Sequence, residues 1–168
     1  MSRRTRGLLV LGAVVVLGVA ALVVYTWTGR VVQPTITQQE ATERVDGYIR
    51  AAIAQLPADA GFTQVVADVM SCEPSSDNGP RGRKVVSRAF ETTAVPVAEF
   101  NRVFDTLKSY WVGNGYVVLE DSRPKDWYLW VQHQPDEFRL SVQGNARGLL
   151  AINASSPCVW PNGTPDPQ

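Results

Sequence analysis

Residues 127–154 read WYLWVQHQPDEFRLSVQGNARGLLAINA, and this stretch decides the fold. It contains three predicted strands, at 127–132, 138–143 and 149–154, and the middle one alternates apolar and polar residues with the period of two that a half-buried strand shows. The segments between the strands are short and rich in Pro, Gly, Asn and Asp, which are turn residues. Because connections this short join antiparallel neighbours, the stretch predicts an antiparallel meander.

Further strands are predicted on the N-terminal side of this stretch. Residues 116–120 and 85–93 each have the length and composition of a strand. Residues 62–70 are ambiguous, because their apolar positions fit a helical stripe whereas their β-branched residues fit a strand. We therefore expect an antiparallel sheet of about four to five strands.

Two segments have apolar residues three and four positions apart, as in a helix with one buried face. The first, 37–56, begins with Thr37 and Glu40 at the spacing of a capping box. The second, 97–111, is followed by glycines that favour a helix end. Because a sheet with one apolar face needs a cover, the sequence predicts an α+β domain at residues 37–164, in which these two helices back the sheet.

The N-terminal region predicts a membrane anchor. Residues 7–27 read GLLVLGAVVVLGVAALVVYTW, contain no charged residue, and as a helix would be about 31 Å long, enough to cross the core of a bilayer. Three arginines in residues 1–6 favour a cytoplasmic N-terminus. We therefore predict a cytoplasmic tail, a single transmembrane helix, a tether at 28–36, an extracytoplasmic domain at the cell membrane, and a disordered tail at 165–168.

A cleaved signal peptide is the alternative for the same segment. Gly18, Val19 and Ala20 place small residues at the positions that a signal peptidase requires, although the apolar run continues well beyond them. Both interpretations export the same domain.

The charge distribution argues against a nucleic-acid partner. From residue 31 onward the chain has 12 basic and 16 acidic residues, a formal charge of −4. Nucleic-acid-binding domains are usually basic, with Lys and Arg gathered on one face. We therefore predict no nucleic acid among the partners.

The two cysteines, Cys72 and Cys158, both follow the predicted anchor. In an oxidising compartment two thiols of a small domain usually pair, so we predict a disulfide between them. A zinc site is the alternative, but two Cys and the single His133, without CxxC or HxxxH spacing, make a poor ligand set. We predict no metal ligand.

No residue pattern predicts catalysis. His133 is the one histidine of the chain and has no recognisable triad context. The neighbouring carboxylates Glu120–Asp121 and Asp136–Glu137 are candidates for glycoside hydrolysis, but both pairs lie at strand ends or turns, where acidic residues are common. No glycine-rich phosphate loop is present. We predict no catalytic residue and no cofactor.

The aromatic residues of the 127–132 strand indicate a candidate binding surface. Trp127 and Leu129 alternate with Tyr128 and Trp130, so large rings lie on both faces of one strand, and only one face meets the helices. If the other face is open, Tyr128 and Trp130 are anchors for a ligand or a partner protein. If residues 62–70 or the C-terminal tail cover it, the rings are part of a second core.

Short motifs carry a resemblance to a known group. They are Leu56-Pro57, a mid-chain Cys72, the step Tyr110-Trp111 to Gly115-Tyr116, and the closing Ser156-Pro157-Cys158-Val159-Trp160-Pro161. With the apolar N-terminal segment, they make the chain similar to small exported actinobacterial proteins, many of them anchored by a lipid or a helix. The resemblance implies export and anchoring and transfers no functional residue. Unlike the lipid-anchored members, this chain lacks the Cys needed for lipidation.

These observations favour a membrane-anchored extracytoplasmic protein with a non-enzymatic binding or accessory role in the cell envelope. Its expected partner is an envelope protein or an apolar or saccharide ligand. The alternatives are an envelope hydrolase that uses a carboxylate pair, and a subunit of a membrane complex that acts through its anchor helix.

Overall fold

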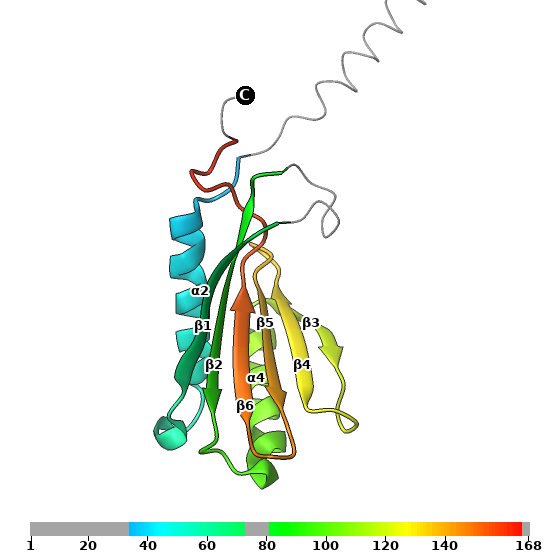
Figure 1. Cartoon of the computed structure of the whole chain (residues 1–168). Coiled ribbons are helices and arrows are strands. Elements are labelled where there is room, and N and C mark those ends of the chain that lie inside the picture. The colour runs from blue at the N-terminus through cyan, green and yellow to red at the C-terminus, as the bar shows by residue number, and fades with distance from the viewer. Residues whose placement is uncertain (1–33, 73–80, 166–168) are drawn as a thin grey trace, which may run out of the picture. The chain divides into compact units, whose positions relative to one another are not determined.

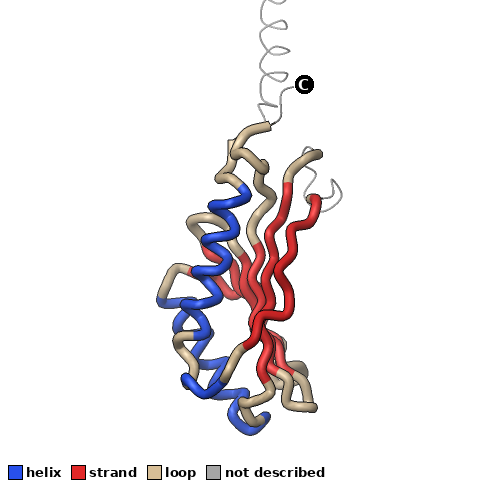
Figure 2. The backbone as a smooth tube through the Cα atoms, turned by 60° about the vertical axis from the view of Figure 1, so that its left-hand side comes forward, coloured by secondary structure: helices blue, strands red, loops and turns tan. Residues whose placement is uncertain are grey.

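The computed structural model describes residues 34–72 and 81–165, and residues 34–168 form one compact unit. Two helices lie on one face of a single antiparallel sheet, so the unit has two layers (Figures 1 and 2). The helices are α2 (Gln38–Ile53) and α4 (Phe100–Gly113), and the strands are β1 (Thr63–Ser71), β2 (Lys84–Thr92), β3 (Tyr116–Asp121), β4 (Tyr128–His133), β5 (Arg139–Gly144) and β6 (Leu150–Ser155). Short 3-10 helices at Ala58–Ala60 and Val97–Glu99 precede β1 and α4.

The sheet has six strands in the order β1-β2-β6-β5-β4-β3. The predicted meander is confirmed, because β3, β4, β5 and β6 are successive antiparallel neighbours. The two N-terminal strands form a separate hairpin, and β2 joins it to the meander by pairing with β6. Strands far apart in sequence therefore meet at the centre of the sheet.

The prediction of four to five strands was wrong, because the ambiguous segment at 62–70 forms strand β1. All nine residues of β1 are exposed, so the strand has no buried face to impose a period of two. A register shift between Gln64 and Val66 further interrupts its alternation. An edge strand without a buried face leaves no reliable pattern in its sequence.

The transmembrane part of the predicted fold class is not found either. Within residues 34–72 and 81–165, no helix is long and apolar enough to cross a bilayer. The predicted anchor at 7–27 lies outside the described residues, as do the predicted cytoplasmic tail, most of the tether, and residues 166–168.

Helix α2 begins with the predicted capping box. The Thr37 hydroxyl accepts a hydrogen bond from the Glu40 amide at 3.1 Å, and the Glu40 carboxylate accepts one from the Thr37 amide at 2.7 Å. These two bonds satisfy amides that the helix itself leaves unpaired. The bond from the Thr37 amide, and then a 2.9 Å bond that the Thr37 hydroxyl donates to the same carboxylate, lower the pKa of Glu40.

The core lies between the helices and one face of the sheet. On β4 the core contains Leu129 and Val131, which are both fully buried, whereas the residues next to them in the strand point to the opposite face. The helices contribute buried residues at steps of three and four, namely Ala41, Val45, Ile49 and Ala52 from α2 and Phe100, Val103, Phe104, Leu107 and Trp111 from α4.

The predicted disulfide between Cys72 and Cys158 is confirmed. It links the end of β1 to the segment that follows β6, across 86 residues of sequence. Beside it, Lys84 and Val159 exchange two backbone hydrogen bonds of 2.7 and 2.8 Å. The C-terminal segment is therefore held against the end of the β1–β2 hairpin.

Candidate functional site on the open face of the sheet

The face of the sheet that points away from the helices is not covered by any of the described elements (Figure 2). Of the two covers considered, residues 63–71 lie in the plane of the sheet as its edge strand. The C-terminal segment passes the end of the sheet, where it bridges to Lys84. We call this surface the open face.

A groove crosses the middle of the open face. One row of opposed residues runs across five strands, from Trp130 through Ser141, Asn153 and Ala89 to Val66. The three central side chains are small and form a floor, whereas the indole ring and the valine stand at the two ends of the row. All five line a cavity of about 260 Å³, which we call the groove.

The next row places a cation beside the indole. Arg139 is opposite both Gln132 and Ser155, and its guanidinium carbon lies 5.4 Å from the centroid of the Trp130 ring. The Arg139 side chain donates a 3.1 Å hydrogen bond to the Gln132 amide oxygen. This cation–π contact and the hydrogen bond hold the charge at the edge of the groove.

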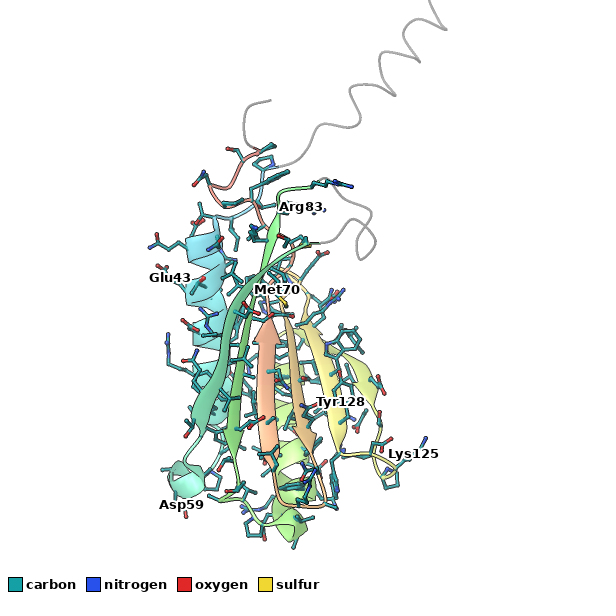
Figure 3. The ribbon with its side chains drawn as sticks, in the orientation of Figure 1. Glu43, Asp59, Met70, Arg83, Lys125 and Tyr128 are labelled. Atoms are coloured by element: carbon teal, nitrogen blue, oxygen red, sulfur yellow. A yellow bond between two sulfur atoms is a disulfide. The ribbon has the colours of Figure 1, made fainter. Side chains whose placement is uncertain are left out.

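The groove continues toward the disulfide. A second cavity, of about 520 Å³, shares Arg139 and Ser155 with the groove and extends to Arg83 and the Cys72–Cys158 disulfide. We call it the disulfide pocket. In Figure 3, Arg83 lies at the end of the sheet where this pocket is, whereas Tyr128 lies over β4. The two cavities adjoin at these shared residues and together extend from the groove to the disulfide, and we call them together the depression.

The structure places both predicted binding residues on the open face. Trp130 lines the groove, whereas Tyr128 lies in the next row, opposite Gln143. Burial raises the pKa of Tyr128, and the negative charge of Glu120 raises it further. The Tyr128 phenol is therefore neutral at physiological pH and can both donate and accept hydrogen bonds.

Neither ring is used by the hydrophobic core. The partly buried residues that pack against the core include Trp127, which lies against Phe100 and Phe104, but not Tyr128 or Trp130. The open face thus carries two large aromatic residues that do not pack in the core between the sheet and the helices. Large side chains of this kind on a concave surface are typical of binding sites.

The two carboxylate pairs considered for hydrolysis do not converge on each other. Asp121 lies at one end of the β3–β4 ladder and Asp136 follows the other end, about five residues or 17 Å away along the strands. Two carboxylates acting on one glycosidic bond are about 5 to 10 Å apart. Within the first pair, Glu120 and Asp121 are neighbours on one strand and point to opposite faces of the sheet.

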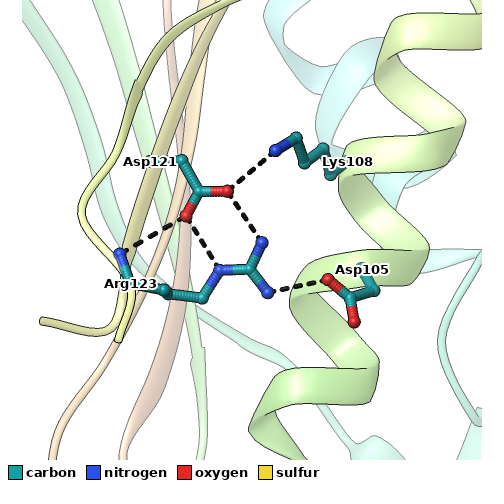
Figure 4. Close-up of polar contacts among 4 residues, drawn as sticks. All are labelled: Asp105, Lys108, Asp121 and Arg123. Carbon is teal, nitrogen blue, oxygen red and sulfur yellow. Dashed lines mark hydrogen bonds and ion pairs between the residues drawn. The ribbon is translucent and has the colours of Figure 1, made fainter. Parts of the chain in front are cut away.

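Asp121 instead belongs to an ion-pair network that joins the β3–β4 turn to helix α4 (Figure 4). Its carboxylate accepts hydrogen bonds from Arg123 at 2.7 Å and Lys108 at 3.0 Å, and Arg123 also contacts Asp105 at 2.8 Å. The bonds from Arg123, and then those from Lys108, hold the pKa of Asp121 far below its usual range despite partial burial. This network has a structural role.

Asp136 belongs to a second network, which the sequence did not reveal. Its carboxylate contacts the Tyr48 hydroxyl and the His133 Nδ1, each at 2.5 Å, and Arg44 at 3.2 Å. Burial raises the pKa of Asp136, but the hydrogen bonds from Tyr48 and His133 outweigh that effect and leave the pKa lowered. The network ties α2 to the β4–β5 turn.

The contacts of His133 do not assemble a nucleophilic triad. Its described ring contacts are the hydrogen bonds to Asp136 and Tyr48 and tilted ring contacts with Tyr116 and Tyr48, with ring centroids 4.6 and 5.2 Å apart. The spacing of His133 and Asp136 across a proline turn is visible in the sequence, but Tyr48 lies 85 residues earlier, so no local pattern reveals the cluster. In the part of the chain that the structure describes, no three His, Cys, Asp or Glu side chains are grouped as for a metal ion.

Comparisons of the chain with protein-family models, with curated proteins and with solved structures found no match. The resemblance to exported actinobacterial proteins stays a prediction, and the open face is the feature of the molecule on which a functional proposal can be built.

Proposed function

We propose that this protein binds a saccharide chain of the cell envelope on the open face of its sheet and carries out no chemistry on it. The observation that supports this most strongly is the pair of rings, Tyr128 and Trp130, that lie on the open face and do not serve the core. They stand beside a floor that combines the polar side chains of Ser141 and Asn153 with the small apolar Ala89.

The residue types in the groove suit a sugar better than an apolar ligand. A sugar ring has apolar C–H faces, which pack on an indole, and a rim of hydroxyls, which need hydrogen-bond partners. Trp130 offers the first kind of contact. The second kind comes from the hydroxyls and amide of Ser87, Ser141, Ser155 and Asn153, which all line the groove.

The proposed location outside the membrane rests on two features. The apolar segment at 7–27 predicts export and anchoring. The Cys72–Cys158 disulfide is of the kind that persists in oxidising compartments. A polymer of the envelope is then the nearest abundant ligand that fits an elongated surface depression.

The hydrolase alternative has less support. The hydrogen bonds of Asp121 and Asp136 are made with cations and tyrosine in the two networks, and the carboxylates are about 17 Å apart along the strands. The elongated shape of the depression favours retention of a chain over cleavage of one bond.

Retention of envelope polysaccharide fragments on the immobilised full-length protein tests the proposal. We expect Trp130→Ala to weaken retention by at least tenfold, Trp130→Phe to keep most of it, and Val112→Ala to leave it unchanged. Val112 is a suitable control because it is 54% exposed but lies on helix α4, in the other layer. Failure of every fragment to bind, or equal losses in the Ala variants of Trp130 and Val112, would refute the proposal.

A further inference from the structure

The cations of the depression gather at one end of it. Arg139 and Arg83 line the disulfide pocket. Glu91 and Glu120 line neither the groove nor the disulfide pocket, because they are outside the residues that surround the two cavities. The depression therefore has a cationic end near the disulfide.

The cationic end differs from the rest of the domain. The chain from residue 31 has a formal charge of −4. Nevertheless, two arginines and one acidic residue, Glu137, line the disulfide pocket in the described part of the chain. A locally positive cavity on an acidic domain attracts anions while the remaining surface repels them, so the charge selects where an anionic group binds.

We propose that the disulfide pocket binds a carboxylate or phosphate group of the same saccharide chain, so that the ligand is an anionic polysaccharide. This inference rests on the proposed function. Arginine is suited to such groups because its planar guanidinium forms paired hydrogen bonds with carboxylate and phosphate oxygens.

The spacing of the residues requires a chain rather than a single sugar. Along β5, Arg139 is two residues from Ser141 of the groove floor, or about 7 Å. Along β2, Arg83 is six residues from Ala89 of the same floor, or about 20 Å. A ligand that stacks on Trp130 and also reaches Arg83 must therefore have several units, with its anionic groups toward the pocket.

The disulfide positions the walls of this pocket. Cys72 and Cys158 both line it, and the Cys72 amide donates a 3.0 Å hydrogen bond to the Arg83 carbonyl. The link fixes the end of the β1–β2 hairpin against the C-terminal segment. Reduction is therefore expected to weaken binding of the anionic group more than stacking on Trp130, which lies on β4 and does not line the disulfide pocket.

The test uses one set of anionic envelope polysaccharide fragments in three forms: untreated, carboxyl-reduced and dephosphorylated. We expect untreated fragments to bind the full-length protein at least tenfold more tightly than the form that lacks the recognised anion, because a hydrogen bond to a charged group contributes about that much. The two treated forms distinguish a carboxylate from a phosphate. The affinity for the untreated form should also fall as salt is raised.

Substitutions locate the anion. Arg139→Gln should reduce binding of the untreated fragments about tenfold more than it reduces binding of the neutralised form, and Arg83→Gln should act in the same direction. Arg102→Gln is the control, because Arg102 is an exposed arginine on helix α4 that pairs with Glu99. Arg139→Lys keeps the charge and should restore part of the affinity.

The outcomes separate the two proposals. If neutralised and untreated fragments bind equally and Trp130→Ala abolishes both, the anionic ligand is refuted and saccharide binding stands. If no form of any fragment binds, the proposed function itself fails. An equal loss of binding in the Arg139 and Arg102 variants would mean that net charge causes the loss, and it would refute the proposal that the disulfide pocket binds the anionic group.

Discussion

The network around Asp136 allows a sharp test of what holds helix α2 to the sheet. The side chain of Asp136 is 15% exposed and accepts hydrogen bonds from Tyr48 and His133. Asp136→Asn keeps the shape of the side chain but removes its charge, which leaves Tyr48 and His133 with a weaker acceptor. Because a hydrogen bond to a charged group contributes about 1.5 to 3 kcal/mol, we expect the free energy of unfolding to fall by about 2 kcal/mol.

Urea denaturation followed by circular dichroism measures this loss, with the disulfide kept oxidised. In a domain of this size, 1 kcal/mol corresponds to about 3–5 °C in melting temperature, so the variant should melt roughly 6–10 °C lower. Tyr48→Phe removes the hydroxyl that donates a hydrogen bond to the Asp136 carboxylate. The double variant should therefore lose less than the sum of the two single variants.

The pH dependence has a definite sign. Because the pKa of Asp136 is lowered in the folded protein, its charge stabilises the fold fully above the pKa of an unfolded aspartate, about 3.9, and this contribution disappears as the pH falls through the lowered value. Wild type and Asp136→Asn should thus differ most at pH 6 and converge toward pH 2. Other carboxylates titrate equally in both proteins and cancel in the comparison.

Glu99→Gln is the control, because Glu99 forms an exposed ion pair with Arg102 and should cost less than about 0.5 kcal/mol. The reasoning would be refuted by an Asp136→Asn loss as small as that of the control. It would be refuted equally by a difference from wild type that stays constant between pH 6 and pH 2.

Three further predictions concern stability. Replacing both Cys72 and Cys158 with Ala should lower the free energy of unfolding by about 4 kcal/mol, because the disulfide closes a loop of 86 residues, and denaturant titration of the double variant checks this value. Leu129→Ala should cost about 2–5 kcal/mol in the same assay, whereas Trp130→Ala on the opposite face should cost less than about 1 kcal/mol, and similar losses would contradict the assignment of faces. Asp121→Asn should lower the melting temperature by several degrees, and the difference from wild type should shrink as the pH falls below 4.

Much of the fold follows from local patterns. The period of two at 127–132 and 138–143 correctly separates Leu129 and Leu140 on the core face from Trp130 on the open face. The capping residues mark the start of α2. These features are predictable because each is set by burial or hydrogen bonding within a few residues.

The remaining features depend on contacts between distant residues. Residues 62–70 stayed ambiguous between helix and strand because the side chains of β1 are exposed on both faces, and its pairing with β2 comes from a hairpin whose loop is long. The pairing of β2 with β6 joins segments about 60 residues apart and has no local signal. In the same way, Arg83 and Arg139 line one pocket only because the disulfide and the sheet bring their segments together.

The position of β6 in the sheet has a consequence for the order of folding. This strand is the last of the chain, yet it lies between β2 and β5 and is the bridge between the N-terminal hairpin and the meander. As the chain leaves the ribosome, β2 can pair with β1, but its other edge has no partner until residues 150–155 emerge. The chain must therefore emerge almost whole before its core can close, so a chain truncated before residue 150 is expected to stay open to chaperones and proteases.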